Sequence, residues 1–188
     1  LVHYSSDYVF DGQKQDLYVE DDMTNPVNVY GKSKLKGEQA IQSISPAYLI
    51  FRLSWVIGGG KQNFLYKVRQ WAQKSKPLKI VSDEVSIPTF TEDIVNITLL
   101  SLKKGIAGLF HLTNSGYASR YELARYFVNK MGLDNIIIPV SINNFKTKAR
   151  RPLFSPMSNS RIAKTLGISI STWQESMDKF VRKMRPRQ

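Results

Sequence analysis

The sequence predicts an α/β fold built on a parallel β-sheet, and three observations support this. The chain begins with a strand–helix–strand pattern: residues 1–4 have a strand composition, residues 28–43 repeat apolar side chains at helical intervals, and residues 48–57 are almost continuously apolar. A strand that is apolar on both faces is typical of a parallel sheet covered by helices. Later segments alternate between helical and strand patterns. Helix-capping residues also stand at the ends of the expected helices.

The remaining elements follow in order. Pro46 ends the first helix, and the crossover in such a strand–helix–strand unit is almost always right-handed. The patterns predict further helices at residues 63–74, 91–104, 119–131, 160–166 and 172–184, and short strands at residues 78–81, 109–113 and 136–140. Two capping boxes are predicted, Ser119 with Glu122 and Thr172 with Glu175. Left-handed helix ends are predicted at Gly105, Gly132 and Gly167.

Composition places the chain among globular proteins of ordinary domain size. Its 188 residues, 42% of them hydrophobic and 22% charged, suffice for one domain with a small appendage. The longest apolar runs are too short to cross a bilayer and no signal-peptide pattern is present, so we expect no membrane association. The absence of cysteine excludes disulfides and thiolate metal sites and fits a reducing compartment. We therefore expect a cytoplasmic protein.

The chain is strongly basic. Twenty-seven Lys and Arg against fifteen Asp and Glu give a net charge of +12, which fits a nucleic-acid surface, an anionic small-molecule substrate or simple solubility. The basic residues are scattered, apart from residues 146–151 and the tail 182–187. No basic helix, zinc motif or aromatic RNA-reading strand accompanies them, so we expect no nucleic-acid partner.

Tyr30 and Lys34 stand four positions apart near the start of the expected helix 28–43. Side chains at this spacing project from one helical face, about one turn apart. A phenol with an ordinary pKa near ~10 is a poor acid–base catalyst at neutral pH, and a neighbouring ammonium lowers that pKa. The pair therefore has the composition of a proton-transfer device, although Tyr and Lys at this spacing also occur by chance.

Ser5, Ser6 and Asp7 follow the first predicted strand at its carboxyl end, which is the edge where open α/β sheets place their ligands. A hydroxyl group there is able to polarise a carbonyl group held beside Tyr30. In the alternative interpretation, the three residues form a turn and satisfy nearby backbone groups, as such residues usually do.

The chain contains, in this order, SSDYVFDG, YVEDD, NPVNVYGKSKLKGE, FRLSWVIGGGKQNF, IVSDEVSIPTFTEDI and RRPLFSPMSNSRIAKTLGISISTWQESM. Together these segments resemble the dTDP-4-dehydrorhamnose reductases, a family of the extended short-chain dehydrogenase/reductase superfamily. The similarity extends from residue 1 to about residue 184. Several motifs that agree in order and spacing are far more specific than Tyr30 and Lys34 alone.

The resemblance implies part of a Rossmann-like, doubly wound parallel sheet with a small α/β substrate-binding lobe. Residues 1–57 are then the C-terminal part of an NAD(P)-binding domain that contains the Tyr-Lys helix. Residues 58–188 are mainly the substrate-binding lobe, and residues 91–115 return to the first domain.

The resemblance also implies roles for individual residues. Tyr30 is expected to be the general acid that protonates the sugar C4 oxygen, and Lys34 is expected to hold the nicotinamide ribose and favour the Tyr30 phenolate. Ser6 stands where the family usually has Thr and is expected to orient Tyr30 and the substrate carbonyl. The substrate-binding residues are then Ser6, Asp7, Trp55, Asn63 and Arg151.

The implied activity is reduction of the 4-keto group of dTDP-4-dehydrorhamnose to dTDP-rhamnose by NADPH or NADH, in an enzyme that forms a homodimer. Asp83-Glu84, Ser86 and Ile57 depart from the family pattern, so the exact sugar nucleotide stays open. Two other functions also stay open. One is a non-catalytic, reductase-like regulatory subunit, as in methionine adenosyltransferase complexes, and the other is a sugar-nucleotide epimerase or dehydratase of the same superfamily.

Other features have simpler interpretations. We expect the apolar side chains of the helix 63–74, among them Phe64, Leu65, Val68 and Trp71, to form a packing face. His3 and His111 have no metal-ligand spacing around them and are expected to be structural. The acidic residues 20–22 are expected to be a solvated loop, with Mg²⁺ binding at an oligomer interface as the alternative.

The three glycines at residues 58–60 follow a strand, but the dinucleotide motif G-x-G-x-x-G would require glycine at Asn63. We therefore expect a flexible loop on the substrate side. By the resemblance, the glycine-rich cofactor turn precedes Leu1, and residues 1–188 are the C-terminal portion of a reductase. We expect this portion alone to be inactive and to bind NADPH weakly.

Overall fold

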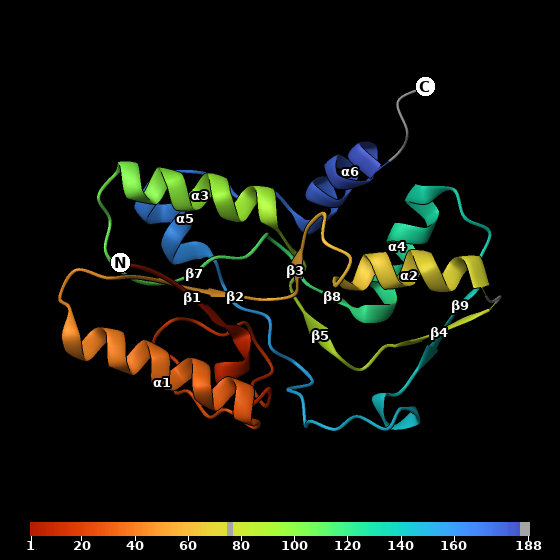
Figure 1. The fold of residues 1–188 in the computed structure, drawn as a ribbon, viewed down its shortest axis with the longest axis horizontal. Coiled ribbons are helices and arrows are strands. Elements are labelled where there is room, and N and C mark those ends of the chain that lie inside the picture. Colours follow the sequence, from red (N-terminus) through yellow and green to blue (C-terminus); the bar gives the residue numbers. More distant parts are fainter. Residues whose placement is uncertain (75–76, 185–188) are drawn as a thin grey trace.

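The computed structural model describes residues 1–74 and 77–184, which form two neighbouring units (Figure 1). The first unit is a parallel sheet with the strand order β1-β2-β7, made of β1 (Val2–Ser6), β2 (Leu49–Leu53) and β7 (Gly108–His111). Helix α1 (Val29–Ile44) lies on one side of this sheet, and α3 (Thr91–Lys103) and α5 (Ser160–Leu166) lie on the other (Figure 1). The predicted α/β fold with a parallel sheet is confirmed.

Side chains of β2 alternate between the two faces of the sheet, as strand geometry requires. Leu49 and Phe51 belong to the apolar core shared with α3 and α5. Arg52 points the other way and forms a two-pronged ion pair with Glu38 of α1, with Nε–Oε1 and Nη2–Oε2 distances of 3.0 and 2.7 Å. This buried pair ties α1 to the centre of the sheet.

The second unit consists of paired short strands and helices. β3 (Val56–Ile57) pairs with β6 (Thr89–Phe90), β4 (Leu78–Val81) with β9 (Ile137–Val140), and β5 (Val85–Ser86) with β8 (Ala118–Ser119). The helices are α2 (Phe64–Lys74), α4 (Arg120–Met131) and α6 (Trp173–Met184). Their shared core includes Leu65, Val68, Leu123, Phe127 and Met177, and we call this unit the lobe.

The predicted helix ends agree closely with the structure. Ser119 and Glu122 form both hydrogen bonds of the capping box at the start of α4, and Thr172 and Glu175 form the same pair of contacts before α6. The left-handed glycines are confirmed, with φ values of 63°, 70° and 64° at Gly105, Gly132 and Gly167.

Two features differ from the sequence analysis. The predicted strand 48–57 is divided, because Trp55 has a left-handed φ of 36° and redirects the chain from the sheet to the pairing of β3 with β6. Helix α5 belongs to the range 58–188 that is expected to form mainly the lobe, but it packs Ile162 and Leu166 into the core of the first unit. Continuous apolar composition does not reveal either change, because both depend on long-range packing.

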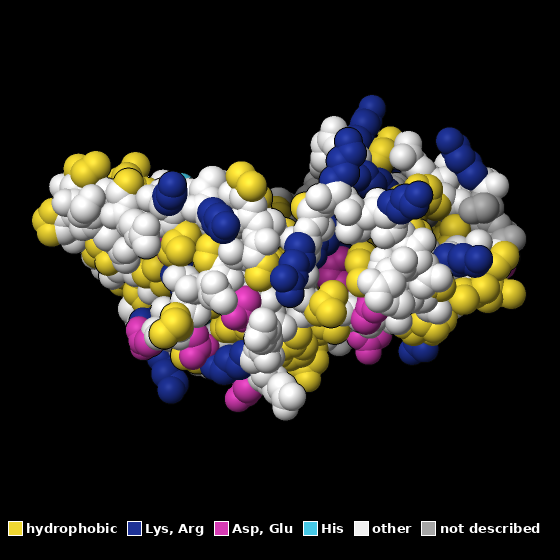
Figure 2. Space-filling view, turned by 90° about the horizontal axis from the view of Figure 1, so that it is seen from below, with side chains coloured by type: hydrophobic (Ala, Val, Ile, Leu, Met, Phe, Trp, Pro, Cys, Tyr) yellow, Lys and Arg dark blue, Asp and Glu magenta, His cyan; other side chains and the backbone are white. Residues whose placement is uncertain are grey.

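The surface shows where the basic charge lies. On the face seen in Figure 2, Lys and Arg side chains are spread out, and Asp and Glu side chains lie among them. Within residues 1–74 and 77–184, no helix is both long enough and apolar enough to cross a membrane.

Candidate active site

Helix α1 begins beside the carboxyl end of β1. The Asn28 side chain caps this helix by accepting a hydrogen bond from the Gly31 amide at 2.8 Å. Tyr30 and Lys34 follow on one face of the first turns, and the Tyr30 side chain is about half exposed (52%). Lys34 Nζ donates to the Tyr4 carbonyl oxygen at 2.7 Å, which anchors the ammonium group to β1.

Gly31 allows α1 to approach the turn that follows β1. A Cβ atom at this position would overlap the carbonyl oxygen of Tyr8. Only glycine therefore lets the helix pack so closely on the 3₁₀ turn Asp7–Val9. The Tyr8 ring meets the Tyr30 ring edge-on, with 5.8 Å between the ring centroids. The glycine beside Tyr30 thus sets the position of Tyr30 relative to the turn.

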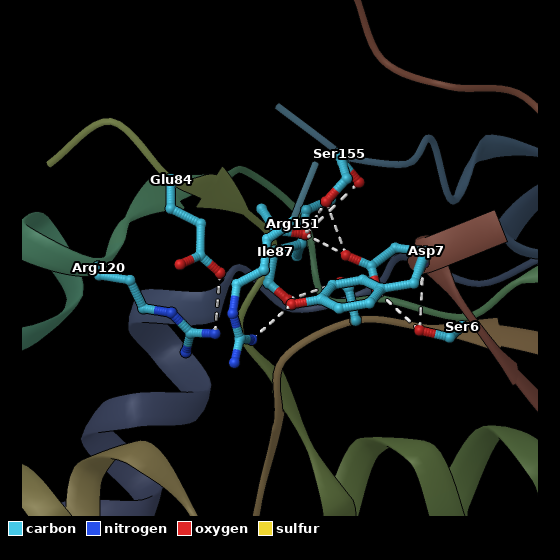
Figure 3. A network of polar contacts seen from close by, with 10 residues as sticks. Ser6, Asp7, Glu84, Ile87, Arg120, Arg151 and Ser155 are labelled. Atoms are coloured by element: carbon cyan, nitrogen blue, oxygen red, sulfur yellow. Dashed lines mark hydrogen bonds and ion pairs between the residues drawn. The ribbon is translucent and has the colours of Figure 1, made fainter. Parts of the chain in front are cut away.

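Asp7 occupies the centre of a buried hydroxyl cluster (Figure 3). Its Oδ1 accepts a hydrogen bond from Ser6 Oγ at 3.0 Å, and its Oδ2 accepts from Ser86 Oγ at 3.0 Å and from Ser155 Oγ at 2.7 Å. Burial raises the pKa of Asp7 to about 6, against the opposing effects of the three serines and of the Arg120 charge. Only 2% of Asp7 is exposed, and both oxygens of this carboxylate accept hydrogen bonds from buried serines.

A cavity of about 510 Å³ in the lobe contains Trp55. The Arg120 guanidinium carbon lies 3.6 Å from the centroid of the Trp55 ring, and Arg120 Nη2 lies 3.4 Å from Glu84 Oε1. One face of the Trp55 ring is therefore covered by a cation, and a ligand has only the other face or the ring edge. The cavity is also lined by Lys67, Lys79 and Arg151, which give it a cationic wall.

Arg151 connects this cavity to α1. Its Nη1 donates to Tyr8 Oη at 2.8 Å, and the Tyr8 ring in turn meets Tyr30. Tyr8, Tyr30 and Arg151 line a second cavity of about 530 Å³. The structure thus brings Tyr30 and Arg151, which are far apart in the sequence, to two sides of one phenol ring.

Asn63 and the three glycines form a separate feature. Asn63 Oδ1 caps α2 by accepting from the Tyr66 amide at 3.0 Å, and Nδ2 donates to the carbonyl oxygens of Gly58 and Gly60. Asn63 lines two cavities, the one lined by Trp55 and a second one beside α3 and α6 that Gly58–Gly60 also line. The glycine loop therefore borders a cavity that Asn63 shares but that Trp55 and Arg151 do not line, and its place on the substrate side stays a prediction.

The helix 63–74 differs in part from the predicted packing face. Leu65 and Val68 are buried in the core of the lobe as expected. Phe64 also packs against this core, and both Phe64 and Trp71 line the cavity that contains Trp55. Helical periodicity identifies the apolar side of α2, but it does not show which part of that side the other elements of the lobe leave uncovered.

The acidic residues 20–22 are not a solvated loop throughout. Glu20 is buried, accepts from the His111 amide at 2.9 Å and lies 3.4 Å from Arg161 Nε. Asp21 pairs with Arg161, and Asp22 pairs with Lys14 at 2.6 Å. Among the described residues, no group of three His, Asp or Glu side chains is arranged to hold a metal ion. The contacts of this segment give no support to a Mg²⁺ site.

Sequence reasoning did not identify Tyr8 and Arg120. Arg120 is the first residue of α4, where the helix dipole disfavours a cation. A positively charged residue at this position therefore indicates that Arg120 has a role other than stabilising the helix. Burial lowers the pKa of Arg120, and Glu84 opposes this effect. Tyr8 lies within a recognised motif, but no local pattern shows that its hydroxyl meets Arg151.

Comparison with known proteins identifies the family. A family model described as the RmlD substrate binding domain matches residues 1–185. The chain belongs to this family. The resemblance to the dTDP-4-dehydrorhamnose reductases that the motifs indicated is thereby confirmed.

Relatives of this RmlD-family chain include the dTDP-4-dehydrorhamnose reductase of Sinorhizobium fredii, which is 36% identical over 96% of this chain and 65% of the relative. The solved dTDP-4-dehydrorhamnose reductase of Clostridium acetobutylicum matches with a TM-score of 0.94 and 33% identity, over 97% of this chain and 65% of that one. The Bacillus anthracis enzyme, solved in complex with NADP, matches over the same shares with a TM-score of 0.92 and 27% identity. The chain spans about two thirds of the length of these relatives.

Proposed function

We propose that the protein containing this chain reduces the 4-keto group of dTDP-4-dehydrorhamnose to give dTDP-rhamnose, with NADPH or NADH as the reductant. The observation that supports this most directly is the placement of Tyr30 and Lys34 beside the carboxyl end of β1, where Tyr30 shares a cavity with Arg151, a residue that also lines the cationic cavity of the lobe. A proton donor and an anion-binding cavity are thus adjacent in a member of the RmlD family.

In this proposal, a bound reduced nicotinamide supplies a hydride to the carbonyl carbon of the sugar. Tyr30 gives its phenolic proton to the carbonyl oxygen, so that the ketone becomes an alcohol and Tyr30 becomes a phenolate. The Lys34 ammonium stabilises the phenolate until solvent returns the proton. Lys34 has three N–H donors, and its bond to the Tyr4 carbonyl leaves two for ribose hydroxyls, so its placement fits the cofactor.

The lobe would bind the nucleotide part of the substrate. Arg120 and Arg151 present guanidinium groups suited to phosphate oxygens, and Lys67 and Lys79 add to the positive charge. Trp55 offers an aromatic surface to a ring of the ligand. A diphosphate is the ligand chemistry that such a cavity favours.

The setting of the enzyme is also part of the proposal. We infer a cytoplasmic enzyme with no nucleic-acid or membrane partner, because dispersed basic residues and the lack of cysteine fit that setting. A homodimer is proposed as well. Val95, Leu99 and Leu102 of α3 are exposed and supply an apolar surface for such a contact.

The test is turnover of dTDP-4-dehydrorhamnose with NADPH by the protein as its gene encodes it. Tyr30→Phe is expected to lower kcat by ~10² to 10⁴, the range for a positioned acid–base group. Lys34→Ala is expected to lower kcat and to weaken NADPH binding. The matched control is Tyr48→Phe, a phenol whose contact is with Gln42, and it should leave turnover unchanged. Unchanged turnover in Tyr30→Phe would contradict the proposal.

A further inference from the structure

The cluster around Asp7 joins parts of the chain that are distant in sequence. Ser6 ends β1, Ser86 lies in β5, and Ser155 lies in the segment after residue 151. All three serines are buried, with exposed fractions of 7%, 1% and 2%. Asp7 accepts hydrogen bonds from serines of both units, so these bonds depend on the position of the lobe relative to the sheet.

The hydrogen bonds of Ser6 limit what it offers to a ligand. A serine hydroxyl has one proton to donate and two lone pairs to accept with. Ser6 Oγ donates its proton to Asp7 and accepts a bond from the Tyr8 amide at 3.2 Å. One lone pair remains, so Ser6 in this arrangement accepts from a hydroxyl group but has no proton for a carbonyl oxygen.

We propose that Asp7 is a positioning residue that sets the hydrogen-bonding direction of Ser6, so that Ser6 accepts while Asp7 is ionised and donates once Asp7 is protonated. This inference rests on the proposed function and on the role expected for Ser6 from the family resemblance, beside the carbonyl group of the substrate. It replaces the expected role of Asp7 as a substrate contact.

The two oxygens of Asp7 determine where the added proton goes. Among the residues that the structure describes, Oδ2 accepts hydrogen bonds from two hydroxyls, those of Ser86 and Ser155, whereas Oδ1 accepts one, that of Ser6. A proton on Oδ1 donates to Ser6 Oγ, and the proton of Ser6 is then free for a ligand. The ionised site suits the alcohol product, and the protonated site suits the ketone substrate.

Charged and titratable groups of the packed elements influence this switch. Arg120 of α4 favours the ionised carboxylate of Asp7. Burial raises the pKa of Tyr8 above its ordinary value. The charges of Glu84 and Asp7 raise this pKa further, and the charge of Arg151 lowers it. Burial brings Asp7 itself close to neutral pH, with its pKa raised to about 6.

The first test measures the coupling without catalysis. The pKa of Asp7 is followed by carboxyl-carbon NMR in the protein as its gene encodes it. Ser6→Ala should raise this pKa by about one unit, because the lost hydroxyl stabilised the ionised form. The control is Ser5→Ala, a neighbouring buried serine whose hydroxyl has no hydrogen-bond partner among the described residues, and it should leave the pKa unchanged. An unchanged pKa in Ser6→Ala would overturn the inference.

The second test uses the pH dependence of kcat/KM for the keto sugar. In the parent protein, kcat/KM should rise about three- to tenfold as the pH falls through about 6, which is the effect of one gained hydrogen bond. Asp7→Asn cannot titrate and should remove this rise, whereas His3→Gln should retain it. A rise that persists in Asp7→Asn, or a parent with a flat profile, would overturn the inference. If the parent protein shows no turnover at any pH, the proposed function is contradicted, and the NMR test still decides the role of Asp7.

Discussion

Trp55 shows how one residue combines an unusual backbone with a specific contact. A bulky aromatic residue in the left-handed region is strained by about 1 to 3 kcal/mol, and such strain persists only where the surroundings hold it. Here Arg120 covers one face of the ring, and Glu84 pairs with Arg120. The left-handed backbone of Trp55 thus positions its ring against Arg120 at the wall of the proposed nucleotide cavity.

Arg120→Ala is expected to weaken dTDP binding about tenfold or more, because charge-assisted hydrogen bonds to phosphate are lost. Thymidine, which has no phosphate, should bind parent and variant equally. Arg120→Lys keeps the charge but not the planar fork and should give an intermediate loss. The measurement is calorimetric titration. Arg125→Ala is the control, since Arg125 of the same helix contacts Tyr121 and does not line the cavity. Equal dTDP affinities in the parent and Arg120→Ala would show that Arg120 is only a packing residue.

At the scale of elements, two contacts on the buried side of α1 fix its position, one in its first turn and one near its middle. Gly31 packs against the turn after β1, and Glu38 pairs with Arg52 in the middle of the sheet. The proposed proton donor Tyr30 therefore lies on a helix whose rotation and depth are both restricted. Breaking either contact should shift Tyr30 relative to Ser6.

Two glycines of α1 provide a paired test of this docking. Gly31→Ala should destabilise the protein and lower its activity, because the added methyl group overlaps the backbone of Tyr8. Gly37→Ala should stabilise it by about 0.5 to 1 kcal/mol, the helix-propensity gain, because its methyl group would meet His3 Nε2 at an ordinary 3.6 Å. Chemical denaturation measures both. Stabilisation by Gly31→Ala would show that α1 does not pack closely on this turn.

For the whole molecule, the free edge of the sheet is the decisive feature. β1 pairs with β2 on one side, and in the part of the chain that the structure describes no strand pairs with its other side. Tyr4 of this strand is 39% exposed, and Leu1, directly before the strand, is 75% exposed. An unpaired edge with apolar side chains favours association with other strands.

We therefore predict that residues 1–188 in isolation self-associate and bind NADPH weakly. Lys34 offers ribose contacts, but the pyrophosphate is normally held by a glycine-rich turn at a helix N-terminus. Light scattering and a fluorescence titration with NADPH measure the two properties, with the protein as its gene encodes it as the reference. Micromolar NADPH binding by a monomeric 188-residue chain would contradict this prediction.

The sequence alone determined the features that depend on neighbours along the chain. Periodicity and caps predicted the helices, including both capping boxes, because a helix is stabilised by contacts within about one turn. The spacing of Tyr30 and Lys34 is likewise local, so their shared face was predictable. The ordered motifs identified the family because their residues and their spacing are properties of the chain itself.

Only the tertiary structure decided how the distant parts meet. The hydroxyls on Asp7 come from positions 6, 86 and 155, and the covering of Trp55 comes from position 120. Asp7 was expected at a sugar but is buried, and residues 48–57 were expected as one strand but divide at Trp55. No local pattern contains these outcomes, because burial and partner choice depend on the packing of the lobe against the sheet, where residues far apart in the chain compete for the same space and the same hydrogen bonds.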